Sequence, residues 1–130
     1  MFTIRSPREV HFGWGVIDNL PAAAARCGHR PLLVVGGSSL ARSGHLDAIP
    51  GALGALGLEP VLFSGVEGDP SVQTVDRGRD AFARSACDCV IAIGGGSALD
   101  AGKAVAGLCN ETAPTADFVA GAPITAPAAP

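Results

Sequence analysis

The sequence predicts an α/β fold in which a parallel sheet is flanked by helices, and three observations predict it. Three short apolar runs, at residues 31–35, 60–63 and 89–93, are bounded by glycines, prolines or polar residues. A segment with helical spacing follows each run. With 130 residues, the chain has the length of one ordinary domain. Apolar strands that alternate with helices are joined by right-handed crossovers, which produce a parallel sheet.

The N-terminal elements come first. Residues 3–13 (TIRSPREVHFG) alternate loosely and are broken by Pro7, which predicts two short strands or an N-terminal β-hairpin. Residues 17–28 (IDNLPAAAARCG) are expected to be helical, because the alanines favour helix and Pro21 suits a first turn. The run PLLVV at 31–35 has no polar position and therefore predicts a strand covered on both faces.

The middle of the chain continues the alternation. Apolar positions between residues 44 and 58 repeat at threes and fours, which predicts a helix. Residues 60–63 predict a second buried strand. In residues 69–85 we expect a helix with Asp69 as its N-cap and Pro70 at its first position.

The last pair of elements is the strand at 89–93 and the helix at 97–108. The tail, residues 110–130, is rich in Pro, Ala and Thr and has no clear period, so we expect a loop there. The predicted order after the hairpin is strand, helix, strand, helix, strand, helix.

Composition excludes several function classes. The net charge is −3 and no basic stripe is present, so we expect no nucleic-acid partner. No apolar run approaches the roughly 18 residues of a membrane span, so we expect no membrane partner. The first ten residues, MFTIRSPREV, lack the apolar region of a signal peptide. The expected location is the cytoplasm.

The four cysteines do not have the spacing of a zinc site. Cys87 and Cys89 are two apart, and a C-x-x-C pair is absent. We interpret them, with Cys27 and Cys109, as small buried hydrophobic residues in a reducing compartment.

Three consecutive glycines, Gly94, Gly95 and Gly96, stand where the third strand passes into a helix (VIAIGGGSALDAGKAVAG, residues 90–107). Ligands of open parallel sheets bind beyond the carboxyl ends of the strands. Residues without a Cβ let backbone N–H groups approach an anion closely, and the helix dipole favours negative charge at this end. We therefore expect a pyrophosphate at residues 94–97.

Neither standard phosphate motif matches in full. The fingerprint G-x-G-x-x-G finds Leu99 in place of its third glycine, and a P-loop would need a hydroxyl where Ala104 stands. A structural alternative is that Ser97 caps the helix, with Asp100 as a short relative of the capping-box Glu and as an ion-pair partner of Lys103.

The segment GGGSALDAGKAVA resembles the G-G-G-S-x-x-D-x-x-K signature of the iron-containing (group III) alcohol dehydrogenases, relatives of glycerol dehydrogenase and dehydroquinate synthase. FGWGVIDNLP is similar to the family's F-G-x-G-x-x-x-x-L-P, and GLEPVLFSGVEGDPSVQTVDRG resembles its segment around N-P-T. The family's strand, turn and helix resemble residues 32–49, LLVVGGSSLARSGHLDAI. Nearly all of residues 11–109 can be laid on the N-terminal half of such an enzyme.

This resemblance implies a Rossmann-like, dehydroquinate synthase-like N-terminal domain over residues 1–109 that binds NAD or NADP. It places Gly94, Gly95, Gly96 and Ser97 on the pyrophosphate, and Asp100 belongs to the same signature. Residues 110–130 then form a loop or linker toward a C-terminal helical domain. In the family that domain holds iron, or sometimes zinc, through one Asp and three His.

Two parts of the family's enzymes are not found in these 130 residues. The family's P-T-T-A-G-T-G-S-E segment and its helical domain are not in the sequence. His11, His29 and His45 match no ligand position, and we expect them at the surface or in turns. We therefore expect no metal ligand and no catalytic residue among these 130 residues, and a chain that by itself catalyses nothing.

Cofactor choice stays open at this point. Where the family often has an Asp for the adenosine ribose, this chain has Gly37, followed by Ser38. The loss of that carboxylate makes NADP tolerable. Asp69 stands where the family has Asn and restores a negative charge nearby, unless it only caps the next helix.

The implied activity is hydride transfer between an alcohol carbon and the nicotinamide, on a small-molecule alcohol or carbonyl substrate, by an enzyme that is a homodimer when complete. A maleylacetate reductase or glycerol dehydrogenase-type relative is one alternative. A non-catalytic nucleotide-binding or interaction module is another.

Overall fold

The structure is a computed structural model that describes residues 9–36 and 45–130. Its elements, in chain order, are η1 (Val16–Asn19), α1 (Leu20–Ala25), β1 (Pro31–Gly36), α3 (His45–Gly54), β2 (Val61–Val66), α4 (Val72–Arg84), β3 (Cys89–Ile93), α5 (Gly96–Leu108) and α6 (Thr115–Val119). The predicted alternation of strands and helices is confirmed.

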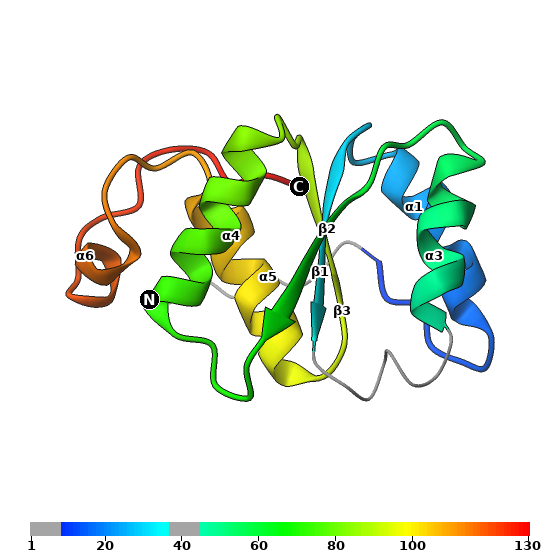
Figure 1. Ribbon diagram of the computed structural model, residues 1–130, viewed down its shortest axis with the longest axis horizontal. Helices are drawn as coiled ribbons and strands as arrows, with labels where there is room; N and C mark the ends of the chain where they lie inside the picture. Colours follow the sequence, from blue (N-terminus) through cyan, green and yellow to red (C-terminus); the bar gives the residue numbers. More distant parts are fainter. Residues whose placement is uncertain (1–8, 37–44) are drawn as a thin grey trace.

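The three strands form a parallel sheet in the order β2-β1-β3. Figure 1 shows the sheet between two layers of helices, with α4 and α5 on one face and α1 and α3 on the other. The predicted α/β class with a parallel sheet and flanking helices is therefore confirmed.

The core is divided by the central strand β1, whose successive side chains point to opposite faces. Leu32 and Val34 pack with Val105 of α5 on one face. Leu33 and Val35 pack on the other face, in a cluster that includes Leu53 of α3. Both faces of β1 are buried, which confirms the interpretation of its unbroken apolar run.

The strand predicted at 60–63 exists, but the prediction that it is buried is wrong. β2 lies at an edge of the described sheet, and the Leu62 side chain is 60% exposed. An apolar run identifies a strand without showing whether it lies at the centre or at an edge, because that depends on strand order.

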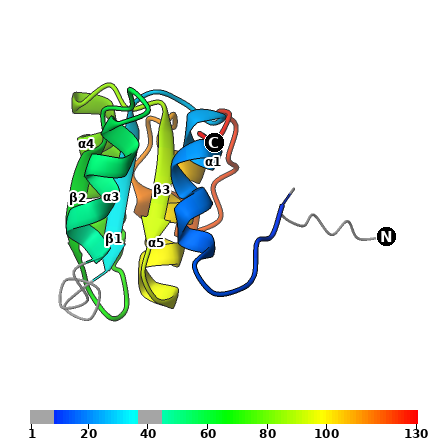
Figure 2. The ribbon, with the colours of Figure 1, turned by 90° about the vertical axis from the view of Figure 1, so that its right-hand side faces the viewer.

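The N-terminal hairpin falls partly on residues that the structure does not describe. Residues 1–8 lie outside the described ranges, and residues 9–13 carry no strand. Figure 2 shows residues 9–13 leading away from the helical layers before η1 begins. A strand needs a neighbour for its backbone groups, and the described part of the sheet provides none for residues 9–13.

Helix α4 begins two residues later than predicted. Its N-cap is Ser71, whose hydroxyl accepts a hydrogen bond from the Thr74 N–H at 3.2 Å. The prediction that Asp69 caps this helix is wrong, because residues 69–70 still belong to the loop after β2. The predicted inner face is confirmed, since Val75, Arg79 and Phe82 are buried.

Residues 110–130, predicted as a loop, contain α6 and otherwise carry neither helix nor strand. The segment packs back on the domain. The Val90 N–H donates to the Pro130 carbonyl at 2.9 Å, and the Ala129 N–H donates to the Ala106 carbonyl at 2.9 Å. The end of this segment therefore lies along the outer edge of β3.

The four cysteines are free thiols. The interpretation as buried hydrophobic residues holds for Cys87 and Cys89, and burial raises the pKa of Cys89 to about 12. It is wrong for Cys27, which is exposed because it follows the end of α1, and Cys109 is only partly buried.

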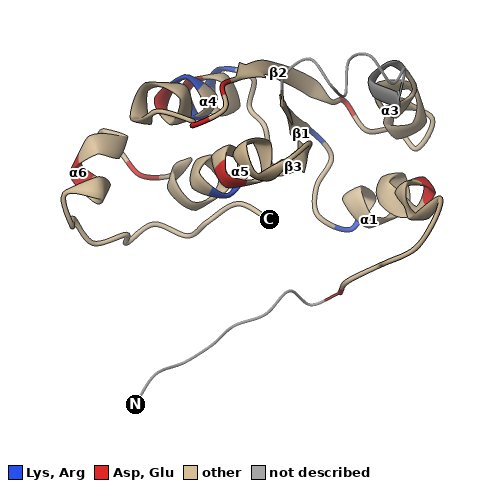
Figure 3. Cartoon of the chain, turned by 90° about the horizontal axis from the view of Figure 1, so that it is seen from below, with Lys and Arg blue, Asp and Glu red and all other residues tan. Residues whose placement is uncertain are grey.

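Charge is mixed over the described surface. Figure 3 shows acidic and basic positions interspersed along α4. Among the described helices, none has the length and apolarity needed to cross a membrane.

Candidate functional site

The end of β1, the loop after β2 and the first turn of α5 meet at the carboxyl edge of the sheet, where Figure 1 shows the first turn of α5. β1 ends at Gly36, next to α5, since a Cβ on Gly36 would lie 3.2 Å from the Ala98 Cβ. The loop after β2 reaches the same helix, because the Ser97 hydroxyl donates a hydrogen bond to the Gly68 carbonyl. Three separate segments of the chain can therefore face one ligand here.

The three glycines after β3 differ in their surroundings. Gly94 has φ +148°, and a Cβ there would lie 2.8 Å from the Ala98 Cβ and 3.3 Å from the Gly36 backbone nitrogen. A side chain at Gly94 would therefore meet both an unfavourable backbone conformation and a close neighbour. Cβ atoms on Gly95 and Gly96 would meet no atom within 4 Å and would point into open space.

The first turn of α5 is suited to an anion. Gly95 is the N-cap residue, and no side chain of the described residues accepts a hydrogen bond from the first-turn N–H groups. These donors and the positive end of the helix dipole face the open space in front of Gly95 and Gly96. The arrangement can hold a phosphate or pyrophosphate group through the backbone.

Ser97 does not act as the helix cap that the structural alternative requires. The helix begins one residue earlier, and the Ser97 hydroxyl is directed to the Gly68 carbonyl across the site. The expected pair of Asp100 with Lys103 is present, with 3.6 Å between carboxylate and ammonium, and both side chains are exposed. An exposed pair of this kind contributes little stability.

Gly102 makes a close contact between α5 and β3. A Cβ at Gly102 would lie 2.5 Å from the Ala92 Cβ of β3. The third glycine of the dinucleotide fingerprint serves the same close contact of helix and strand. In this chain the contact is made three residues after Leu99, which stands where the fingerprint has that glycine.

The residues proposed for the ribose are only partly described. Gly37 and Ser38 lie outside the described residues. Asp69 is exposed and directly follows Gly68, whose carbonyl contacts Ser97. Asp69 therefore stands beside the glycine turn, and the helix-capping explanation for its charge no longer applies.

Glu67 is a second acidic residue of this loop that sequence reasoning did not find. Its two carboxylate oxygens lie 2.8 and 2.7 Å from the hydroxyl of Thr74, which is fully buried in α4. The Arg77 guanidinium lies 3.6 Å away. The Thr74 hydroxyl foremost, and Arg77 to a smaller extent, hold the pKa of Glu67 below its ordinary value.

Metal ligands do not gather in the described part of the chain. No group of three His, Cys, Asp or Glu side chains is placed to hold an ion within residues 9–36 and 45–130. His11 and His29 are exposed, and the side chain of His45 is not described.

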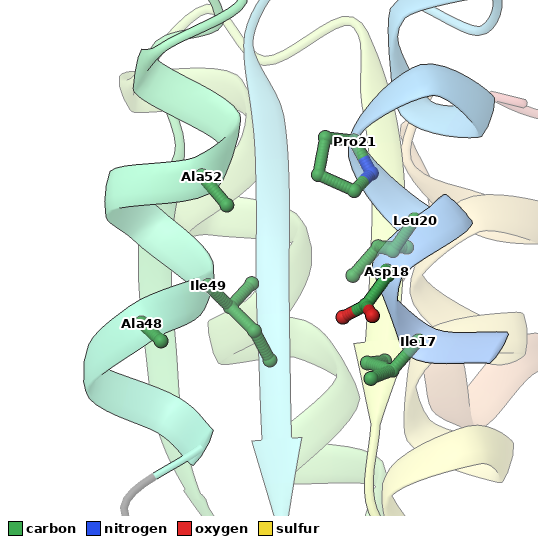
Figure 4. A pocket seen from close by; sticks show the side chains of 7 residues that line it. All are labelled: Ile17, Asp18, Leu20, Pro21, Ala48, Ile49 and Ala52. Atoms are coloured by element: carbon green, nitrogen blue, oxygen red, sulfur yellow. The ribbon is translucent and has the colours of Figure 1, made fainter. Parts of the chain in front are cut away.

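A separate apolar cavity of about 200 Å³ lies between α1 and α3, on the face of the sheet opposite α5. Figure 4 shows the residues that line it, which are Ile17, Asp18, Leu20, Pro21, Ala48, Ile49 and Ala52. None of the glycine-turn residues contributes to this cavity.

Comparison with known proteins identifies the family. The family model described as "Iron-containing alcohol dehydrogenase" matches residues 7–130. The NADPH-dependent butanol dehydrogenase of Clostridium saccharobutylicum is 39% identical over 105 residues, which are 81% of this chain and 26% of that protein. The chain thus spans about a quarter of the length of the curated relatives it matches.

Solved structures agree with this similarity. The NADH-dependent butanol dehydrogenase A of Thermotoga maritima superposes with a TM-score of 0.87 at 28% identity, over 100% of this chain and 33% of that one. The sulfoacetaldehyde reductase of Bifidobacterium kashiwanohense, solved in complex with NAD+, has a TM-score of 0.85 at 26% identity, over 100% and 34% of the two chains. Because the family model matches residues 7–130, the chain belongs to the iron-containing alcohol dehydrogenase family.

Proposed function

We propose that this chain binds NAD or NADP for an alcohol dehydrogenase that interconverts an alcohol and an aldehyde or ketone by hydride transfer. The observation that carries the proposal is the uncapped N-terminus of α5 behind the open Cβ positions of Gly95 and Gly96. The relatives named as butanol dehydrogenases support the alcohol substrate class.

The chain's own residues bind and orient in this proposal. Backbone N–H groups of the first turn of α5 hold the pyrophosphate, and Gly94 makes the turn that presents them. Ser97 links this turn to the loop after β2, and Asp100 lies on the exposed side of the second turn. The nicotinamide, when bound, supplies the hydride chemistry. Within residues 9–36 and 45–130, no three His, Cys, Asp or Glu side chains are placed together to hold iron or zinc.

The test of this site uses the longest protein that the reading frame of this chain encodes. Titration with NADH and NADPH, followed by nucleotide fluorescence, should show binding. Gly95→Val should weaken it at least about tenfold, because a side chain would occupy the space that the pyrophosphate needs. Gly107→Val is the matched control, since it also points into open space but lies at the other end of α5. Equal affinities of the Gly95→Val variant and the wild type would place the phosphate elsewhere.

For the adenosine ribose we propose Gly37 and Ser38, which follow β1, with Asp69 as the nearby acidic residue. The relatives are named as NADPH-dependent in one case and NADH-dependent in another, so the family admits both cofactors. Gly37→Asp should penalise NADPH over NADH by about one to two powers of ten, because a carboxylate repels a 2′-phosphate and accepts from a 2′-hydroxyl. An unchanged ratio of the two dissociation constants would move the ribose toward Asp69.

We also propose that the complete enzyme is a homodimer in the cytoplasm, with small-molecule substrates and neither nucleic acid nor membrane as a partner. Val10, Phe12 and Trp14 support a dimer, because these alternating side chains are 77%, 99% and 105% exposed. A second copy is the occupant that would cover them, and light scattering measures the resulting mass. The free buried thiols of Cys87 and Cys89 support a reducing compartment.

A further inference from the structure

We infer that Thr74 is a positioning residue for the nucleotide site, although it lies inside α4 and its side chain is fully buried. In this inference Thr74 holds Glu67, and Glu67 in turn fixes the loop whose Gly68 carbonyl accepts the hydrogen bond of Ser97. The inference rests on the proposed cofactor function and adds to it a residue that does not touch the cofactor.

The first step is the link between the loop and the glycine turn. The Ser97 hydroxyl, in the first turn of α5, donates to the carbonyl of Gly68, which is 29 residues earlier in the chain. The position of the Gly68 carbonyl therefore influences how the first turn of α5 is held. A displaced loop would leave the Ser97 hydroxyl without its partner.

The second step is that the loop begins at Glu67, directly after the end of β2. Val66, the last residue of the strand, is only 5% exposed and belongs to the core. A Cβ on Gly68 would meet no atom within 4 Å, so the residue after Glu67 has no packed side chain to hold it. The Glu67 side chain therefore ties the backbone just before the Gly68 carbonyl to α4.

The third step is the anchor itself. The Thr74 hydroxyl has one proton and lies within 2.8 Å of both Glu67 oxygens, so it donates that proton to one of the oxygens or shares it between the two. Thr74 is held in turn, because its N–H donates to the Ser71 hydroxyl and the Arg77 guanidinium approaches its Oγ1 at 3.3 Å. A buried hydroxyl on a fixed helix is therefore joined to a half-exposed carboxylate on a glycine-rich loop.

The experiment compares Thr74→Val with Thr74→Ser in the longest protein that the reading frame encodes. Thr74→Val removes the hydroxyl and keeps the shape, and we expect NAD(P)H to bind about tenfold more weakly. Thr74→Ser restores the hydroxyl and should bind within about twofold of the wild type. Thr115→Val is the matched control, because Thr115 is also a buried threonine that donates to a carboxylate, that of Asp76 at 2.6 Å, but it holds residues 110–115.

A loss of stability alone would affect Thr74→Val and Thr115→Val alike, whereas positioning lowers cofactor affinity only in the first. Glu67→Ala supplies a double-mutant cycle, in which Thr74→Val should have no further effect on affinity once its partner is absent. If the wild type binds neither NADH nor NADPH, the proposed function fails. If the wild type binds but Thr74→Val binds equally well, the positioning role is overturned and the proposed function stands.

Discussion

Gly94, Gly95 and Gly96 are consecutive, yet the space around them differs. Gly94 has a positive φ and lies against Ala98 and Gly36, so the local structure itself requires a glycine at this position. Gly95 and Gly96 have open space in front of them and helix donors behind them, which fits the pyrophosphate site that we propose there. At the scale of the residue, one triplet therefore combines a folding requirement with the proposed binding site.

This division predicts that two alanine variants differ in how much stability they lose. Gly94→Ala should lower the free energy of unfolding by about 1–3 kcal/mol, because the methyl group meets a strained backbone and a close neighbour. Gly96→Ala should change it by less than about 0.5 kcal/mol, since the methyl group at this first helical residue points into open space. Urea denaturation measures both. Equal losses in the two variants would contradict the assigned roles.

Helix α4 connects the parts of the molecule through polar side chains as well as through its apolar face. Near its start Thr74 holds the loop after β2, and further along Arg79 holds the segment after α5. The Arg79 guanidinium donates to the carbonyls of Glu111 at 2.6 Å and Ala113 at 2.8 Å. It also pairs with Asp76 at 3.0 Å, and its side chain is only 10% exposed. At the scale of the element, α4 is the anchor of the two loops beside it.

The anchor predicts the effect of removing Arg79. Arg79→Met should destabilise the protein by about 2–4 kcal/mol, because partly buried carbonyls and the Asp76 carboxylate lose a charged donor. Hydrogen exchange should rise at residues 111–115 more than in β1. Arg84→Met, at an exposed position in the last turn of the same helix, is the control and should behave like the wild type. Unchanged exchange at 111–115 would show that other contacts hold this segment.

The whole molecule is tied together by carboxylates that accept hydrogen bonds from distant segments. Thr115 lowers the pKa of Asp76, and the N–H groups of Ala126 and Thr125 lower the pKa of Glu111. Burial alone would raise the pKa of Asp88, but the N–H groups of His29 and Arg30, each at 2.8 Å, outweigh it and lower the pKa. In each case the ionised form is the one that the fold stabilises.

A pKa that is lower in the folded than in the unfolded state gives stability that is present above the unfolded value and is lost as pH falls through the folded value. The ordinary values are 3.8 for Asp and 4.5 for Glu, so the free energy of unfolding should be steady near neutral pH and should decline below about pH 5. Denaturant titrations between pH 7 and pH 3 measure this decline. Asp88→Asn should make it shallower, and Asp100→Asn, in an exposed ion pair, should leave it as it is. A stability that does not decline in acid would contradict this account.

The sequence by itself determined the elements whose signals are local. The unbroken apolar run of β1 predicts a strand covered on both faces, and the spacing of α5 predicts a helix that starts directly after the glycine turn. Both depend on residues adjacent in the chain, because strand and helix periodicities arise from the backbone itself. The family signature at residues 94–103 is equally local.

Only the tertiary structure decided where the polar side chains find their partners. For Ser97 the sequence leaves helix capping open as an alternative, but its hydroxyl donates to the Gly68 carbonyl. For α4 the sequence predicts Asp69 as the N-cap, but Ser71 takes that role. Glu67 was not singled out until Thr74 was seen against it. A hydrogen bond of a side chain depends on which loops the sheet brings together. That arrangement follows from strand order and packing, which no local pattern records.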